Sequence, residues 1–188
     1  MDRENIIEDV KIFGFWIYLM TDLVIFAVLF AVLRNNTFGG LSGRELFHLP
    51  FAFAETLILL TSSFTCSLAT YSVYRQQKNA VLFWFAVTFA LGLSFLYLEV
   101  SEFSRFIDAG ASPQRSAFLS SFFALVGVHG FHISLGLLWM GAAMANLWFR
   151  GLLAPVVSRV FRLAFFWHFL DVVWIFIFTA VYAMGHLL

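Results

Sequence analysis

Five long runs of apolar residues set what this chain can fold into. Each run is long enough to cross a membrane, since a helix needs about 20 apolar residues to span a hydrocarbon core about 30 Å thick. Of 188 residues, 62% are hydrophobic and 12% are charged, which leaves little polar surface for a soluble globule. We predict an all-α integral membrane protein, one domain over residues 1–188. Its five transmembrane helices are expected at 12–33, 49–74, 80–103, 116–149 and 163–188.

The segments between these runs are short, which predicts one antiparallel bundle. The sequence RQQKN at residues 75–79 predicts a tight polar turn, and the connections at 104–115 and 150–159 each contain one proline. The acidic segment at residues 1–11 has no small-residue cleavage site, so we expect no cleaved signal peptide.

The Lys and Arg residues near the predicted helix ends indicate the orientation in the membrane. One side would carry Arg3, Lys11, Arg75, Lys78, Arg150, Arg159 and Arg162, and the other side Arg34, Arg44, Arg105 and Arg115. Loops rich in Lys and Arg stay in the cytoplasm. We therefore expect a cytoplasmic amino terminus and a periplasmic carboxyl terminus.

Several function classes are disfavoured by composition. The net charge is zero and there is no basic tract, so nothing indicates a nucleic-acid partner. The single cysteine, Cys66, excludes an intrachain disulfide. The chain shows no internal repeat of the kind that marks many secondary transporters.

Ionisable residues inside the apolar runs are the candidate functional groups, because such residues are costly in a bilayer. They are Asp22, Glu55, Glu99, Glu102, His129, His132, His168 and Asp171. With a rise of about 1.5 Å per residue, the predicted helix ends give an inner and an outer polar layer. Asp22, His168 and Asp171 would lie within about 15 Å of the cytoplasmic ends, and Glu55 and Glu102 near the outer ends.

His129 and His132 share one helix face, and Gly130 between them would let another backbone approach. Imidazole binds haem and metal ions, so a cofactor site is one interpretation. The only other deep histidine, His168, is estimated more than about 10 Å lower, which is poor geometry for a bis-histidine haem. A metal site built from these histidines and Asp171 has the same spread in depth. We favour a role in helix packing.

The remaining polar residues allow structural and functional interpretations. His168 and Asp171 are three residues apart and predict a polar pair that joins helices. Asp22 predicts a hydrogen bond to a histidine or to a lipid, or alternatively a proton relay station.

On the predicted third helix, Glu99, Glu102 and Arg105 recur every three residues. That spacing is typical of an interfacial ion-pair ladder rather than of a catalytic acid pair. Glu55 could join this outer layer.

Four segments carry a family resemblance: TLILLTSSFTCSLA, FLYLEVSEF, VGVHGFHISLG and WHFLDVVWIFIFTAVYAMG. Together they resemble the signature segments of subunit III of the haem-copper respiratory oxidases, in the order that the family has them. The segments KIFGFWIYLMTD and RELFHLPFAFAET are more similar to the bacterial bo-type ubiquinol oxidase branch than to the cytochrome c branch. The resemblance covers nearly the whole chain.

This resemblance implies an accessory subunit of a proton-pumping ubiquinol oxidase in a bacterial inner membrane. It implies no catalytic, cofactor-binding or metal-binding residue in this chain, with the haems and copper in subunit I. The implied partners are subunit I, subunits II and IV, and phospholipids. Asp22 would be the family's buried carboxylate, and the other polar residues would order lipid and helix packing.

Three alternatives remain open at this point. The chain could be subunit III of a cytochrome c oxidase. It could be a self-contained di-haem membrane cytochrome with His129 or His132 as ligands. It could also be a proton or ion carrier that acts alone through Asp22.

Overall fold

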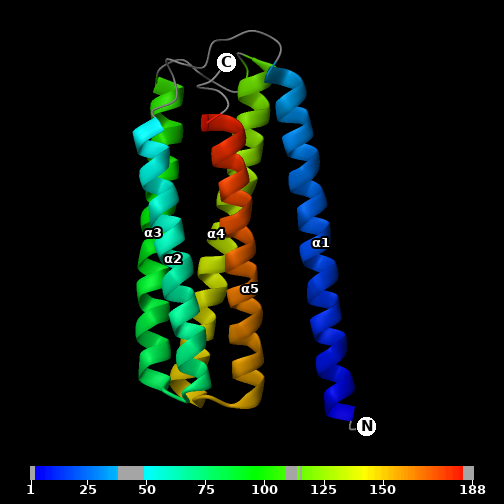
Figure 1. Ribbon diagram of the computed structural model, residues 1–188, viewed down its shortest axis with the longest axis vertical. Coiled ribbons are helices and arrows are strands. Elements are labelled where there is room, and N and C mark those ends of the chain that lie inside the picture. Colours follow the sequence, from blue (N-terminus) through cyan, green and yellow to red (C-terminus); the bar gives the residue numbers. More distant parts are fainter. Residues whose placement is uncertain (1–2, 38–48, 109–113, 115, 184–188) are drawn as a thin grey trace.

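The computed structural model describes residues 3–37, 49–108, 114 and 116–183, which form five long helices (Figure 1). All five helices are long and apolar enough to cross a membrane, so the predicted number of spans is confirmed. A short π-helix, η2, continues the fifth helix. The bounds are α1 (Arg3–Thr37), α2 (Leu49–Tyr74), α3 (Lys78–Asp108), α4 (Ala117–Arg150), α5 (Ala154–Ile177) and η2 (Phe178–Ala183).

Local sequence explains the ends of α2 and α4. After α2, Gln76 adopts a left-handed conformation with φ of 56°. Its N–H donates to the Val73 carbonyl, and the Gln77 N–H donates to the Ser72 carbonyl. These two bonds form a Schellman motif, which gives the tight turn expected at this site. At the start of α4, the Ser116 hydroxyl accepts a hydrogen bond from the Leu119 N–H, as an N-cap does.

The predicted start of the fifth helix, at residue 163, is wrong. The helix begins at Ala154, so the segment predicted as a connection is helical from that residue onward. The reason is Pro155, which occupies the first helical turn, where the missing N–H of proline costs no hydrogen bond. The real connection is Gly151–Leu153, and Gly151 has a positive φ of 71°. The predicted end of this helix, at 184–188, lies outside the described residues.

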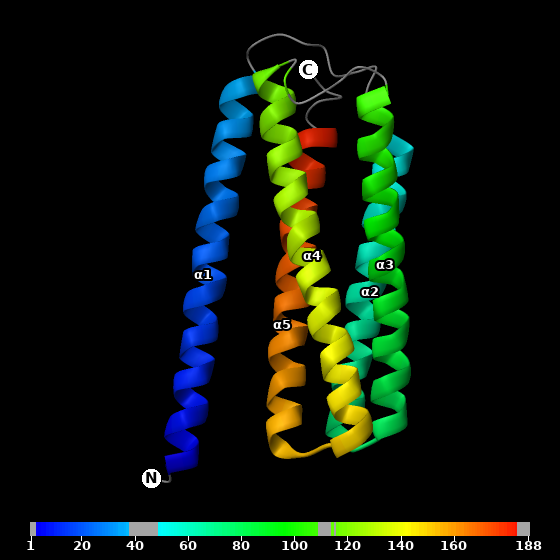
Figure 2. The same cartoon turned by 180° about the vertical axis from the view of Figure 1, so that it is seen from behind.

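Helices α2 to α5 form a closed four-helix bundle, in which α2 packs on α3, α3 on α4, α4 on α5 and α5 on α2. Helix α1 packs on the outside of this bundle, against α4 and to a smaller extent α5. In both views α1 leans away from α5 toward its amino-terminal end (Figures 1 and 2). The α1 start and the η2 end lie at opposite ends of the molecule (Figure 1).

Large aromatic side chains fill the bundle core. Trp167 and Trp174 share one face of α5, as their spacing predicts, and both are fully buried with Phe85, Phe95 and Phe122. Most large side chains on α1 remain exposed to the surroundings, as expected for a helix that contacts the bundle on one face.

Candidate functional site

The first polar contact joins α1 to α4. The His132 Nε2 lies 3.4 Å from the Asp22 Oδ2, and both side chains are largely buried. The His132 Nδ1 lies 2.7 Å from the Val128 carbonyl, which can only accept, so Nδ1 carries a hydrogen. Nε2 faces the Asp22 carboxyl, so the two side chains form a polar contact across the α1–α4 interface, which suits a buried site.

His129 lies one turn earlier on α4 and is enclosed by aromatic rings. Its imidazole stacks on Trp174 at a centroid distance of 5.3 Å and meets the edges of Phe95 and Phe26 at 6.0 and 6.3 Å. The side chain is completely buried, and neither ring nitrogen has a hydrogen-bond partner. The contacts of His129 are those of a packed aromatic side chain.

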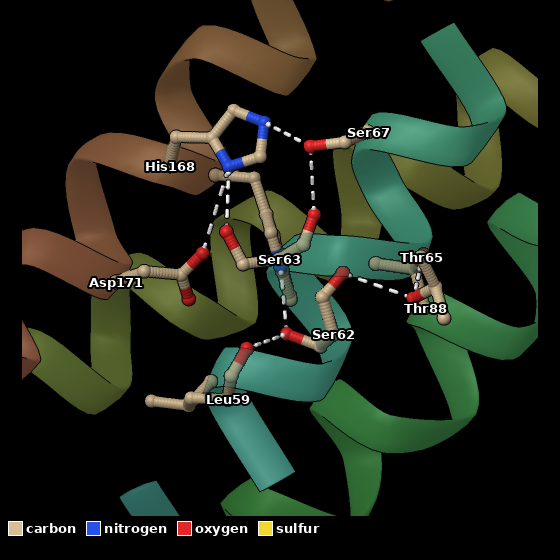
Figure 3. Close-up of polar contacts among 9 residues, drawn as sticks. Leu59, Ser62, Ser63, Thr65, Ser67, Thr88, His168 and Asp171 are labelled. Atoms are coloured by element: carbon tan, nitrogen blue, oxygen red, sulfur yellow. Dashed lines mark hydrogen bonds and ion pairs between the residues drawn. The ribbon is translucent and has the colours of Figure 1, made fainter. Parts of the chain in front are cut away.

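A second polar group, the His168 cluster, joins α5 to α2 and consists of Ser63, Ser67, His168 and Asp171. Figure 3 shows the imidazole of His168 directed toward both serines and toward Asp171. The Ser63 Oγ lies 2.8 Å from Nδ1, and the Ser67 Oγ lies 3.4 Å from Nε2. The nearest Asp171 oxygen lies 3.8 Å from Nδ1. Asp171 lies beyond hydrogen-bond distance of Nδ1, and the Ser67 hydroxyl at Nε2 also donates to the Ser63 carbonyl, so the arrangement does not have the geometry of a nucleophilic triad.

The third group, the carboxyl cluster, consists of Glu55 on α2 with Glu99 and Glu102 on α3. All three side chains are buried, at 0%, 3% and 5% exposure, and they interact electrostatically. The Glu99 carboxyl lies against Gly130 of α4, where a Cβ atom would come within 2.8 Å of Oε2. Gly130 therefore admits a side chain, whereas its sequence context predicted the approach of a backbone.

Sequence comparison identifies the family of this chain. A family model for cytochrome c oxidase subunit III matches residues 4–186. The chain belongs to this family. It is 53% identical to the cytochrome bo(3) ubiquinol oxidase subunit 3 of Pseudomonas aeruginosa, over 94% of this chain and 86% of that protein. It is 43% identical to the quinol oxidase subunit 3 of Bacillus subtilis, over 98% of this chain and 92% of that protein.

A third relative is the cytochrome bo(3) ubiquinol oxidase subunit 3 of Buchnera aphidicola, which is 43% identical over 93% of this chain and 94% of that protein. The predicted membership of subunit III of the haem-copper oxidases is thus confirmed, and so is the similarity to the quinol oxidase branch. The three polar groups described above are therefore features of a subunit III fold.

The observed helix bounds change the residue counts behind the predicted inner layer. Asp22 is 13 residues from either end of its span, Asp9–Asn35. His168 is 14 and 13 residues from the ends of Ala154–Val181, because α5 begins earlier than predicted. Ser67, which contacts His168, is only seven residues from the Tyr74 end of its span. The depth of this layer therefore stays a prediction, whereas the contact between His132 and Asp22 is observed.

The outer layer also differs from the prediction. Glu99 and Glu102 are buried, so they do not form a ladder on an exposed surface. The Arg105 guanidinium lies over the Phe51 ring, 5.1 Å from its centroid. Glu55 joins Glu99 and Glu102, as predicted. The spacing on one helix was informative, but the burial depends on α2 and α4, which pack over the carboxyls.

A metal site built from His129, His132, His168 and Asp171 is not supported by the geometry. Among the described residues, no group of three or more His, Cys, Asp or Glu side chains could hold a metal ion. Sequence reasoning also missed the hydroxyl groups of α2. Thr56 accepts from the Trp174 indole and Ser62 from the Trp167 indole, each at 3.1 Å. The signal was present, since the segment from Thr56 to Ser67 contains six Ser and Thr residues.

Proposed function

We propose that this chain is the third subunit of a bacterial bo-type ubiquinol oxidase and takes no direct part in the chemistry. The observation that carries the proposal is the 53% identity, over 94% of this chain, to a ubiquinol oxidase subunit 3. In such a complex, quinol oxidation is coupled to the reduction of oxygen to water. We place the haems and copper of that reaction in subunit I, and none in this chain.

The contacts of the buried histidines support a structural role. His132 uses both ring nitrogens, one toward Val128 and one toward Asp22. His168 likewise contacts a serine with each nitrogen. His129 is packed among three aromatic rings. His132 and His168 thus each join two helices, and His129 joins α4 to three others, which is what a supporting subunit needs. The di-haem alternative would require these contacts to be broken.

We further propose a multi-pass location in the bacterial plasma membrane, with the amino terminus in the cytoplasm. The ends of α1 and η2 at opposite faces of the bundle fit five crossings. The charge rule then assigns the end that carries Arg75, Lys78 and Arg150 to the cytoplasm. Alkaline phosphatase fused after η2 should be active, since that enzyme needs the periplasm. Activity only in a fusion made at the α2–α3 turn would reverse the orientation.

The proposed partners are subunit I, subunits II and IV, and phospholipids. The exposed apolar surface of α1, including Val10, Phe13, Ile17 and Val24, supports contact with membrane-embedded partners or lipid chains. In this role the polar layers stabilise the bundle that supports subunit I beside its proton-uptake region.

The experiment that tests the proposed function is a pull-down of the tagged chain in mild detergent. The eluate is examined by absorbance spectroscopy and by oxygen uptake with ubiquinol, and separately with reduced cytochrome c, as electron donor. We expect haem and quinol-dependent activity to arrive with a larger partner and to vanish when this chain is isolated. Activity with cytochrome c alone would favour the cytochrome c oxidase branch. Haem that stays on the isolated chain would refute the proposed function.

A further inference from the structure

The outward face shared by α2 and α5 is apolar except at its centre. Its rim consists of Leu60, Phe64 and Tyr71 on α2 with Phe165, Val172 and Phe176 on α5, all between 45% and 64% exposed. Within this rim lie two polar side chains of the His168 cluster. Ser67 is exposed, and 36% of the His168 side chain is accessible. We call this surface the α2–α5 face.

The polar centre of this face lies inside the candidate membrane spans of both helices. His168 is 14 and 13 residues from the ends of Ala154–Val181, and Ser67 is 17 and 7 residues from the ends of Pro50–Tyr74, so both lie at least about 10 Å from a span end. Acyl chains cannot form hydrogen bonds, and ionisable side chains in spans face a protein interior or a water-filled cavity rather than lipid. A partly exposed histidine at this depth therefore indicates that another protein segment covers it.

The ring of His168 has one long contact that a neighbouring segment could improve. Nδ1 lies 2.8 Å from the Ser63 hydroxyl oxygen and 3.8 Å from Asp171, whereas Nε2 lies 3.4 Å from the Ser67 hydroxyl oxygen. The distance at Nε2 is longer than the usual 2.9–3.0 Å, so Nε2 can bind a closer polar group.

Small residues at the same site allow close approach. Ser63 and Ser67 are four residues apart on α2 and form a small-x-x-x-small pair, the pattern that lets helix backbones pack closely in membranes. The apolar rim would supply van der Waals contact on both sides. The position of the site inside the spans, the long contact at His168 Nε2 and the small residues on α2 therefore all favour another helix as the occupant.

We propose that the α2–α5 face packs against a transmembrane helix of another subunit of the complex. That helix presents a polar side chain, such as a hydroxyl or an amide, to His168 Nε2 within the membrane. The inference rests on the proposed function, because a partner subunit must exist. It deepens that function by assigning the surface and the chemistry of the contact.

The test places a photoreactive phenylalanine analogue at Phe64 or at Val172 in the intact complex. The matched control is Phe131 on α4, an aromatic residue of similar exposure near the middle of its own span. An adduct of any kind at Phe131 shows that the label reacts at this depth. We expect adducts from Phe64 and Val172 on one transmembrane segment of another subunit, with a polar residue near the labelled site. Lipid adducts alone from both positions would overturn the proposal.

A second measurement tests the hydrogen bond. His168→Leu should lower the fraction of partner retained in detergent by about threefold, the size of an average interhelical hydrogen bond in a membrane. His168→Gln keeps a donor and should restore most of the retention. Equal retention in His168→Leu and wild type, at equal amounts of folded chain, would also overturn the proposal.

The failure of the inference is distinguishable from failure of the proposed function. A chain that purifies with the haem-containing subunit but yields only lipid adducts contradicts the inference alone. A chain that purifies with no haem-containing subunit contradicts the proposed function itself.

Discussion

The two faces of α4 are held by opposite means. Toward α3 and α5, glycines let large side chains enter: Gly130 faces the Glu99 carboxyl, and Gly136 faces the Phe166 and Trp167 rings. Toward α1, large side chains reach across instead. Phe15 meets Trp139 at a centroid distance of 6.3 Å, and Asp22 meets His132.

This difference indicates how each interface responds to mutation. The interface of α4 with α3 and α5 depends on glycines that leave room for neighbouring side chains. Adding a methyl group at a glycine should therefore lower stability more than removing a contact does. The α1–α4 interface depends on the reach of a few side chains, so their loss should loosen α1 while the four-helix bundle remains folded.

The largest effect is expected from Gly92→Ala on α3. The new Cβ would lie 2.8 Å from Cη2 of Trp167 and 2.9 Å from Cδ2 of Leu137, and the buried indole is too rigid to give way. Overpacking of this kind costs about 1–3 kcal/mol. We expect the thermal unfolding midpoint of the purified chain in detergent to fall by several degrees. Gly141→Ala on α4 is the control, since nothing lies within 4 Å of its Cβ position. A similar loss in both variants would contradict the steric explanation.

A smaller loss of stability is expected from Gly130→Ala, because the atoms nearest the new Cβ belong to the flexible end of the Glu99 side chain. The new Cβ would lie 2.8 Å from one Glu99 carboxyl oxygen and 2.9 Å from the other. We expect a cost of about 1–2 kcal/mol. Replacing Glu99 by alanine in the same chain should remove most of this cost, and a double-mutant cycle measures that rescue. Strict additivity of the two changes would show that Glu99 does not contact Gly130.

The Asp22–His132 pair tests the α1 side of the comparison. Asp22→Asn keeps the size of the side chain but replaces its carboxyl group by an amide, and it should weaken the attachment of α1 by about 1 kcal/mol. We expect faster proteolytic cleavage near the start of α1. In the assembled complex, the initial rate of quinol oxidation should stay near that of wild type, because the proposed redox centres lie in another chain. An immediate loss of nearly all activity would argue for a direct role of Asp22.

Much of the fold could be predicted from the sequence because it depends on local signals. Apolar length predicted five spans, and the spacing of His168 and Asp171 predicted their pairing, since both lie on one helix. The start of α5 was missed because Pro155 suggests a connection until its place in the first helical turn is known.

Contacts between helices could not be predicted in the same way. Asp22 meets His132, and that contact depends on how α1 packs on α4. The burial of Glu99 depends on a glycine that is 31 residues away in the sequence, and no pattern within α3 encodes it. Depth counted along one helix is also only as accurate as the predicted helix ends.

The smallest effect is expected on the α2–α5 side of the bundle, where hydrogen bonds add to an already close fit. Ser62→Ala removes the acceptor for the buried Trp167 indole without introducing a clash. Interhelical hydrogen bonds in membranes contribute about 0.6 kcal/mol on average, so the loss of stability should be well below that of Gly92→Ala. The control is Ser94→Ala, because Ser94 is exposed and bonds only to Ala90 within α3. A loss in Ser62→Ala as large as that in Gly92→Ala would mean that Trp167 is positioned by its hydrogen bond rather than by the space that Gly92 and Gly136 leave for its ring.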